Sequence, residues 1–232
     1  MVKQLSFSEL IPEQKQLNEF VWGENLVLQH HLTHVLENAD DKFVYIWGPQ
    51  GSGKSHLLQT ICSQYDADLS SIYVPLSMWD ALSPQSLENL EQQDIVCIDD
   101  IQMIAQKPLW EEAIFHLYNR IRDKKTTLLI IAGSHPPQLL GLCLPDLCSR
   151  LQWGLTWYLK EPADEFKIHI LMKTAEKKGF VITETVAKYL LSHYDRNLNK
   201  LMQIIEQVDR ASLEAQRKNI SIRFLKTCLT LD

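Results

Sequence analysis

Apolar residues recur at helical spacing over residues 28–39 and then give way to short, almost continuous apolar runs. Such runs, bounded by polar turn residues, are typical of buried β-strands. Helix-spaced segments separate these runs. One, at residues 57–61, follows a glycine-rich turn, and another begins at Pro108. Ser83-Pro84 marks the start of a further helix. The strands are expected over residues 43–47, 71–74, 95–98, 128–132 and 155–159.

Strands that are apolar along their whole length are covered on both faces, and their alternation with helices favours parallel pairing. The pattern therefore predicts an α/β fold with a five-stranded parallel sheet and helices on both of its faces. After Glu161-Pro162 only helical spacing remains, and Gly179 is placed to end the first of these helices. We expect three parts: a tail (1–12), an α/β base (13–160) and a small all-α lid (161–232).

One segment matches a phosphate-binding loop at every fixed position and lies between a predicted strand and a predicted helix. Its glycines let several backbone N–H groups point at one anion, and the dipole of the following helix adds to the attraction. A lysine there reaches the β- and γ-phosphates, and a serine hydroxyl ligates Mg²⁺. The residues are Gly48, Pro49, Gln50, Gly51, Ser52, Gly53, Lys54 and Ser55, followed by His56 on the helix.

A second motif ends a buried strand in two acidic residues, Asp99 and Asp100. Ligands bind at the carboxyl edge of parallel sheets, so Asp99 is expected to hold Mg²⁺ together with Ser55. Asp100 is a candidate base that polarises an attacking water, or the N-cap of the next helix, and the two roles are compatible. Ser134, at the tip of a later strand, is either a γ-phosphate contact or a turn residue.

Composition narrows the class of protein. The net charge of −6 and pI near 5.8 make the chain a poor stand-alone DNA binder. Five cysteines without metal-type spacing indicate a reducing compartment and no zinc site. No apolar run approaches the roughly 20 residues of a membrane span, and the N-terminus lacks a signal-peptide pattern, so we expect a cytoplasmic protein with no membrane partner.

The chain resembles the DnaA branch of the AAA+ family. The resemblance rests on the segments 98–102 and 149–156, and on 109–121 and 209–218, which are similar to the Hda group of DnaA-related regulators. It implies bound ADP or ATP and an arginine finger at Arg150 that reaches a neighbour's nucleotide; the alternative for Arg150 is a helix-end cation. It also implies a nucleotide-sensing lid arginine at Arg196, for which the alternative is a solvated residue at a helix start.

The same resemblance implies partners. The tail residues Gln4, Leu5, Ser6 and Phe7 resemble motifs that dock into the sliding clamp (the β subunit of DNA polymerase III), with Gln in a polar notch and the apolar side chains in pockets. DnaA is the expected second partner, and a homodimer is a further candidate assembly. Direct sequence-specific DNA binding is not expected, because the resemblance ends with the lid. Adenine contacts are assigned by analogy to residues 20–22, although Trp22 fits a core position equally well.

The function that the resemblance implies is that of an adenine-nucleotide-binding regulator of replication initiation. We expect it to be tethered to the clamp, to stimulate ATP hydrolysis by DnaA through Arg150 acting in trans, and so to prevent re-initiation. The alternative is a stand-alone AAA+ ATPase, such as a helicase loader or remodeller. The phosphate-loop lysine, Lys54, and the second acidic residue, Asp100, are both present, so intrinsic ATPase activity is compatible with the sequence. The sequence decides neither which nucleotide is bound nor the oligomeric state.

Overall fold

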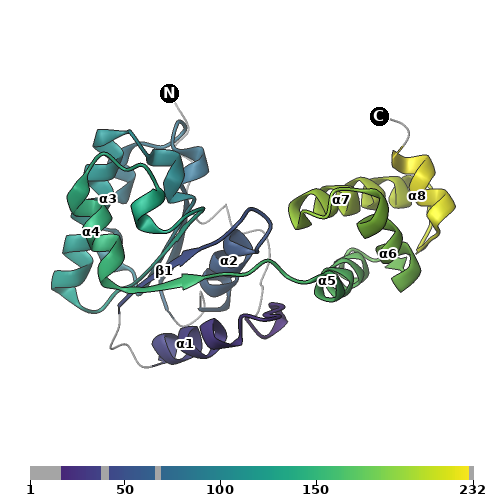
Figure 1. Ribbon diagram of the computed structural model, residues 1–232, viewed down its shortest axis with the longest axis horizontal. Helices are drawn as coiled ribbons and strands as arrows, with labels where there is room; N and C mark the ends of the chain where they lie inside the picture. Colours follow the sequence, from purple (N-terminus) through teal and green to yellow (C-terminus); the bar gives the residue numbers. More distant parts are fainter. Residues whose placement is uncertain (1–16, 38–41, 66–68, 230–232) are drawn as a thin grey trace. The chain divides into compact units, whose positions relative to one another are not determined.

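The structure is a computed structural model that describes residues 17–37, 42–65 and 69–229 (Figure 1). Its contacts divide the chain into two compact units, and the second comprises Gln50–Ser52 and the residues from Glu161 onward. The predicted tail motif lies outside the described residues. No helix within the described part of the chain is long and apolar enough to cross a membrane. The same residues contain no cluster of three or more His, Cys, Asp or Glu side chains that could hold a metal ion.

The first unit is built on a five-stranded sheet in which every pair of neighbouring strands is parallel. The spatial order is β2-β3-β4-β1-β5. The predicted strands and their parallel pairing are thereby confirmed. Their bounds are β1 Phe43–Trp47, β2 Ser71–Pro75, β3 Ile95–Asp99, β4 Leu128–Gly133 and β5 Leu155–Tyr158.

Two apolar cores lie on opposite faces of this sheet. Side chains alternate along a strand, so Val44 and Ile46 of β1 belong to one core and Tyr45 to the other. The first core is completed by α1 (Leu26–Glu37) and α2 (Lys54–Tyr65), and the second by α3 (Pro108–Lys124) and α4 (Pro145–Trp153). Figure 1 shows the two helix pairs on either side of β1, as expected for a sheet covered on both faces.

Short 3₁₀ segments connect these elements. The helix expected from Ser83-Pro84 is only one of them, because the backbone leaves helical geometry directly after Leu87: Glu88 is extended, with ψ = 141°, and Asn89 is left-handed, with φ = +64°. The 3₁₀ segments are Leu17–Glu19, Leu76–Met78, Pro84–Leu87, Leu90–Gln92, Ile101–Ile104 and Pro137–Leu139.

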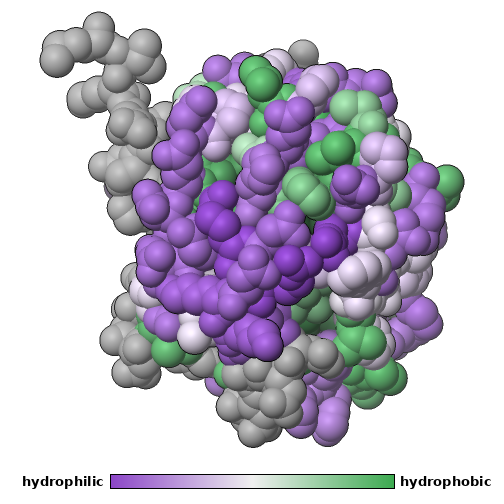
Figure 2. Space-filling model, turned by 90° about the vertical axis from the view of Figure 1, so that its left-hand side faces the viewer, coloured by the Kyte–Doolittle hydropathy of each residue, from purple (hydrophilic) through white to green (hydrophobic). Residues whose placement is uncertain are grey.

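The surface beside α3 and α4 is mainly hydrophilic with scattered apolar side chains (Figure 2).

The second unit is helical, as predicted, around a core of its own. Gly179 has φ = +88° directly after the first helix, which is the left-handed conformation that ends helices at glycine. A parallel pair of two-residue strands, which the sequence pattern did not indicate, joins two loops of this unit. The helices are α5 Asp164–Lys177, α6 Glu184–His193, α7 Leu198–Glu214 and α8 Ile222–Leu229, and the strands are β6 Val181–Ile182 and β7 Asn219–Ile220.

A buried carboxylate fixes the start of α4, the helix that carries Arg150. Glu111 on α3 is fully buried and accepts backbone N–H groups from Gln106 (2.9 Å), Cys143 (3.1 Å) and Leu144 (2.7 Å). Leu144 is the N-cap residue of α4, and its own side chain offers no oxygen to cap the helix. Glu111 therefore joins α3, the loop before it and the first turn of α4 through hydrogen bonds to a single side chain.

Replacing this carboxylate tests its structural role. Glu111→Gln keeps the volume but turns one acceptor into a donor that faces backbone N–H groups, so the free energy of unfolding should fall by about 1.5–3 kcal/mol. The matched control is Glu112→Gln, the exposed neighbour on the same helix, for which we expect a change within about 0.5 kcal/mol. Urea unfolding of the three proteins measures both values, and equal losses in the two variants would contradict the role of Glu111.

Candidate functional site

The glycine-rich loop connects β1 to α2, whose first residue is Lys54. Gly51 and Gly53 have φ values of +90° and +95°, which favour glycine over residues with a Cβ atom. A Cβ atom on Gly53 would also lie 3.4 Å from the ring of Phe20. The loop therefore needs glycine at both positions for their backbone conformation, while the Phe20 ring lies at ordinary contact distance from Gly53.

Lys54 is the cation of the loop, and its side chain is folded back over it. The ammonium donates to the carbonyls of Gly48 (2.7 Å) and Pro49 (2.9 Å), and the residue is buried. Burial lowers the pKa of Lys54, while the charges of Asp99 and Asp100 oppose that shift. One positive charge is thus held next to the N-terminus of α2, where the helix dipole also favours an anion.

Asp99 ends β3 and is almost fully buried, at 1% exposure. It accepts hydrogen bonds from the Tyr73 hydroxyl (2.8 Å) and the backbone N–H of Asp100 (2.9 Å), and its side chain is also hydrogen-bonded to that of Ser55. Burial raises the pKa of Asp99, the charge of Asp100 raises it further, and these hydrogen bonds counteract the rise. The two residues predicted to share Mg²⁺, Ser55 and Asp99, are therefore in direct contact.

Asp100 does not cap the following segment with its side chain, contrary to one of its two predicted roles. It lies at φ = +57°, a left-handed conformation that aspartate tolerates better than most residues. Its carboxylate accepts from the Gln102 amide (2.8 Å), and the carbonyl oxygen of that amide accepts the N–H of Ser134 (3.0 Å). Gln102 thus joins the ends of β3 and β4. The Ser134 hydroxyl is hydrogen-bonded to the ring of His135 (2.9 Å).

Sequence reasoning assigned no role to Tyr73 or Gln102, although both contact the predicted acidic pair. The strand register offers a signal for Tyr73, because β2 ends beside β3 and Tyr73 pairs with Cys97, two residues before Asp99. The same side of neighbouring strands carries residues two positions apart. Gln102 gives no comparable signal, since its contacts depend on a 3₁₀ turn that folds it back over the strand ends.

The residues present fit a nucleotide phosphate chain and a magnesium ion. The loop combines left-handed glycines, a buried lysine and the N-terminus of a helix, and the Ser52 hydroxyl is buried without a hydrogen-bond partner among the described residues. Next to it lie a serine hydroxyl and a carboxylate, oxygen ligands of the kind that Mg²⁺ prefers.

Aromatic residues adjoin the loop. The ring of Phe20 stacks on His56, with centroids 5.8 Å apart, and meets the edge of Trp22 at 4.7 Å. Trp22 belongs to the apolar core with 6% exposure, in line with the core alternative for this residue. Its indole N–H is buried and has no hydrogen-bond partner among the described residues.

Arg150 lies in the last turn of α4, away from the residues that form the loop site. Its guanidinium stacks over the ring of Trp153 at 4.2 Å, and Trp153 is 67% exposed. One guanidinium nitrogen, Nη1, is buried without a partner among the described residues. No described contact joins Arg150 to the glycine-rich loop, Asp99 or Asp100. The arrangement suits a cation directed at another molecule.

Arg196 belongs to the second unit, two residues before α7. Its guanidinium forms an exposed ion pair with Asp164 at 3.4 Å, and its carbonyl accepts from Lys167 (2.8 Å). Lys167 is itself buried and pairs with Glu161 (2.7 Å). The backbone around Arg196 is thus fixed within the lid, while its guanidinium stays at the surface.

Two family models match the chain. The model for the bacterial DnaA ATPase domain covers residues 11–158, and that for the lid domain of Hda covers residues 164–229. Domain III of the Thermotoga maritima replication initiation protein DnaA has a TM-score of 0.78 at 23% identity, over 95% of this chain and 97% of that chain.

More distant structures share the fold. AMPPCP-bound DnaA from Aquifex aeolicus has a TM-score of 0.70 at 21% identity, over 88% of this chain and 68% of that chain. The Thermotoga maritima RuvB Holliday junction branch migration motor has a TM-score of 0.68 at 16% identity, over 96% and 72%. At these identities the likenesses show the architecture.

The buried carboxylate of Asp99 should leave a signature in stability. Its folded-state pKa lies above the ordinary value of 3.8, so the protein loses stability as the pH rises from near 4 through that raised pKa. Asp99→Asn cannot ionise, and its stability relative to wild type should therefore increase across the same interval. Unfolding free energies between pH 4 and pH 8 measure the trend.

The exposed Asp123→Asn on α3 serves as the control for removing one carboxylate from the chain. A stability difference between wild type and Asp99→Asn that stays constant with pH would contradict the burial cost at Asp99.

Proposed function

This chain belongs to the bacterial DnaA ATPase-domain family and carries a lid of the Hda type, and on that premise we propose that it is an adenine-nucleotide-binding regulator of replication initiation. In this proposal it acts on DnaA, whose ATP hydrolysis it stimulates in trans, preventing re-initiation. The observation that carries the proposal is the position of Arg150, stacked on an exposed tryptophan and without contact to its own loop site.

The nucleotide, ADP or ATP, is bound by the loop from Gly48 to Ser55, with Lys54 at the β- and γ-phosphates. Ser55 and Asp99 hold Mg²⁺, which supplies charge neutralisation on the phosphate oxygens. Tyr73 orients the Asp99 carboxylate, because its hydroxyl donates to one carboxylate oxygen while the Asp100 N–H donates to the other. His56 and Arg196 line the same site in this proposal, with Arg196 sensing the nucleotide from the lid.

Arg150 supplies the stimulating group. A guanidinium directed at a γ-phosphate stabilises the negative charge that develops there in the transition state. Trp153 supports the side chain from one side at 4.2 Å, which limits the conformations it must lose on reaching the partner. The network around Glu111 fixes the start of the same short helix. The finger is thus held in place by packing before the partner arrives.

A second candidate function is autonomous ATP hydrolysis, favoured by the complete set of Lys54, Asp99 and Asp100. Asp100 is the base in this alternative, and Gln102 holds its carboxylate at 2.8 Å beside the end of β4. The chain would then work as a helicase loader or remodeller in an assembly of its own copies. The two functions differ in whose nucleotide Arg150 reaches.

The clamp brings the regulator to its place of action. In this part of the proposal Gln4, Leu5, Ser6 and Phe7 form an extended peptide that occupies pockets of the sliding clamp. The support is the resemblance of this short motif. The reaction takes place in the cytoplasm, where DnaA and the clamp are found.

Removing the finger tests the main proposal. Arg150→Ala should reduce the stimulation of DnaA ATPase by about 10³-fold, as loss of an arginine finger does in other phosphoryl-transfer enzymes. Arg150→Lys should recover little, because a lysine lacks the planar fork. Arg122→Ala, an exposed arginine on α3, is the matched control and should act as wild type.

The assay is ATP hydrolysis by DnaA in the presence of clamp loaded on DNA. Full stimulation by Arg150→Ala would refute the finger. Steady turnover by the isolated chain that disappears in Asp100→Ala would support the autonomous ATPase instead.

Shortening two tail side chains tests the clamp contact. Gln4→Ala/Leu5→Ala should weaken binding to purified clamp about tenfold or more, since burying a leucine contributes about 1.5–3 kcal/mol. Ser8→Ala, just beyond the motif, is the control. Affinities measured by surface plasmon resonance decide the matter, and a double variant that binds as tightly as wild type would remove the tail from the proposal.

A further inference from the structure

Charge is divided unevenly along the chain. Residues 1–160 contain 11 basic and 19 acidic side chains, a net charge of −8, whereas residues 161–232 contain 12 and 10, a net charge of +2. Within the lid the excess is concentrated further. Residues 215–229 carry four basic side chains and no acidic one, namely Arg217, Lys218, Arg223 and Lys226. All four are exposed. We refer to them as the basic corner.

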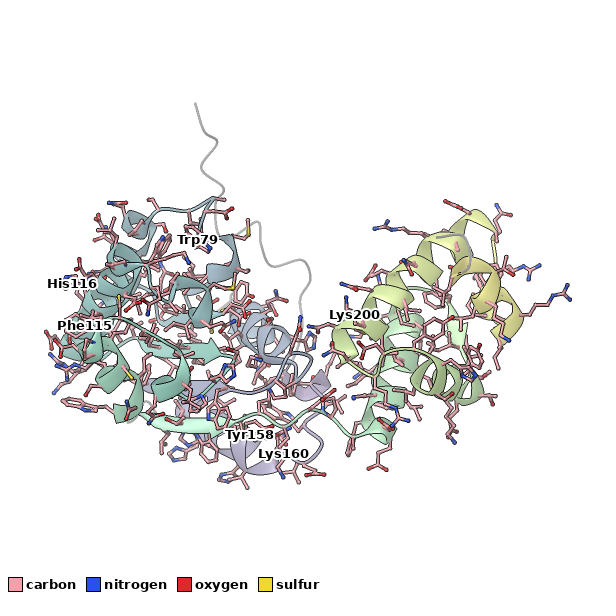
Figure 3. The ribbon with its side chains drawn as sticks, turned by 45° about the horizontal axis from the view of Figure 1, so that its top comes forward. Trp79, Phe115, His116, Tyr158, Lys160 and Lys200 are labelled. Atoms are coloured by element: carbon pink, nitrogen blue, oxygen red, sulfur yellow. The ribbon has the colours of Figure 1, made fainter. Side chains whose placement is uncertain are left out.

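The basic corner lies on the loop that follows α7 and on the next helix, α8. α7 ends at Glu214, the chain turns at Gln216 with φ = +50°, and Arg217 and Lys218 follow directly. The carbonyl of Lys218 accepts the N–H of Val181 (2.7 Å), which fixes the loop against β6. The next helix, α8, carries Arg223 and Lys226 three residues apart, a spacing that places both on one side of a helix. Nitrogen-tipped side chains project from this end of the lid in Figure 3.

Aromatic rings are interleaved with these cations. The Arg217 guanidinium lies over Phe224 at 5.3 Å, and the Lys226 ammonium lies over Tyr189 at 5.4 Å. The nearby acidic residues Glu206 and Asp209 pair with Lys178 instead, at 2.9 and 3.4 Å. Arg217, Lys218 and Arg223 have no acidic partner among the described residues. The fold thus groups three positive charges that no acidic side chain in the described part of the chain neutralises.

We propose that the basic corner of the lid binds the phosphate backbone of duplex DNA without reading its sequence. The ligand must be an extended polyanion, because a single phosphate cannot engage cations spread over a loop and a helix. This proposal rests on the proposed function, in which the protein is tethered to a clamp on DNA. The proposed contact is made directly with that DNA and involves no recognition of its sequence.

The magnitudes support a contact that matters only when the protein is tethered. Non-specific protein–DNA contacts have dissociation constants of about 10⁻⁴–10⁻⁶ M at physiological salt. The net charge of −8 on residues 1–160 weakens binding of the free protein further. Tethering to the same DNA raises the effective concentration to about the millimolar range, enough to populate such a weak site.

The experiment is the salt dependence of binding to a fluorescent duplex, measured by anisotropy between 50 and 200 mM salt with the full-length protein. Four phosphate contacts predict a slope of log K against log salt of about −3.6, at about −0.9 per contact. Arg217→Ala/Lys218→Ala should change the slope by about two contacts, to about −1.8. Lys218→Glu, which leaves both cation–aromatic contacts intact, should weaken binding in the same direction.

The matched control is Lys188→Ala/Lys200→Ala, which also removes two exposed lid cations. Lys200 lies in the first turn of α7, the end opposite to the basic corner, and is labelled in Figure 3. The slope of log K against log salt for this double variant should equal that of wild type. Equal slopes for all variants would overturn the proposal. Tighter binding to polyglutamate than to the duplex would overturn it too, and would assign the basic corner to an acidic protein.

The result is separable from the fate of the proposed function. Duplex binding needs neither clamp nor DnaA, so it tests the basic corner by itself. If basic-corner variants lose DNA binding while Arg150→Ala leaves DnaA stimulation intact, the basic corner stands and the regulator fails. If duplex binding does not depend on the basic corner while stimulation depends on Arg150, the further inference fails and the regulator stands.

Discussion

The architecture of the candidate site depends on one buried carboxylate, that of Asp99. An ionised carboxylate at 1% exposure is costly unless hydrogen bonds replace the lost water. Here a tyrosine from β2, a serine from α2 and the backbone N–H of the next residue supply them. Each donor comes from a different part of the chain. The cost of burying Asp99 is therefore offset only when β2, β3 and the glycine-rich loop are assembled together.

A second buried carboxylate, Glu111, performs a comparable task for the loops that follow β3 and β4. It receives three backbone N–H groups and fixes the start of α4, whereas Asp99 organises the loop at α2. The first network serves the nucleotide that the protein would hold itself. The second serves the arginine that it would offer to a partner. The two functions proposed for the chain thus depend on separate polar networks within one α/β unit.

Much of this structure could be predicted from the sequence, because its determinants are local. The five strands follow from continuous apolar runs, and the loop follows from fixed glycine and lysine spacings. The sequence did not reveal the roles of Tyr73, Gln102 and Glu111. Each has a hydrogen-bond partner that lies 26 to 33 residues away along the chain, and Gln102 also depends on a tight turn. The Ser83-Pro84 start signal was real, but the extended backbone at Glu88 and the left-handed one at Asn89 end the segment after a single 3₁₀ turn. Asp100 illustrates a further limit, since a left-handed backbone took its side chain away from the cap position.

The strand order has a consequence for how the protein is made. β1 lies between β4 and β5, so Trp47 pairs with Gly133 and with Tyr158, which is 111 residues further along the chain. During synthesis at about 5–20 residues per second, β1 waits about 6–22 seconds for its last neighbour. One edge of this apolar strand stays unpaired for that whole time on every nascent chain, and the other edge stays unpaired until β4 has been made. The glycine-rich loop, which directly follows β1, can therefore take its final form only near the end of the α/β unit's synthesis, and chaperones have their longest access to this strand.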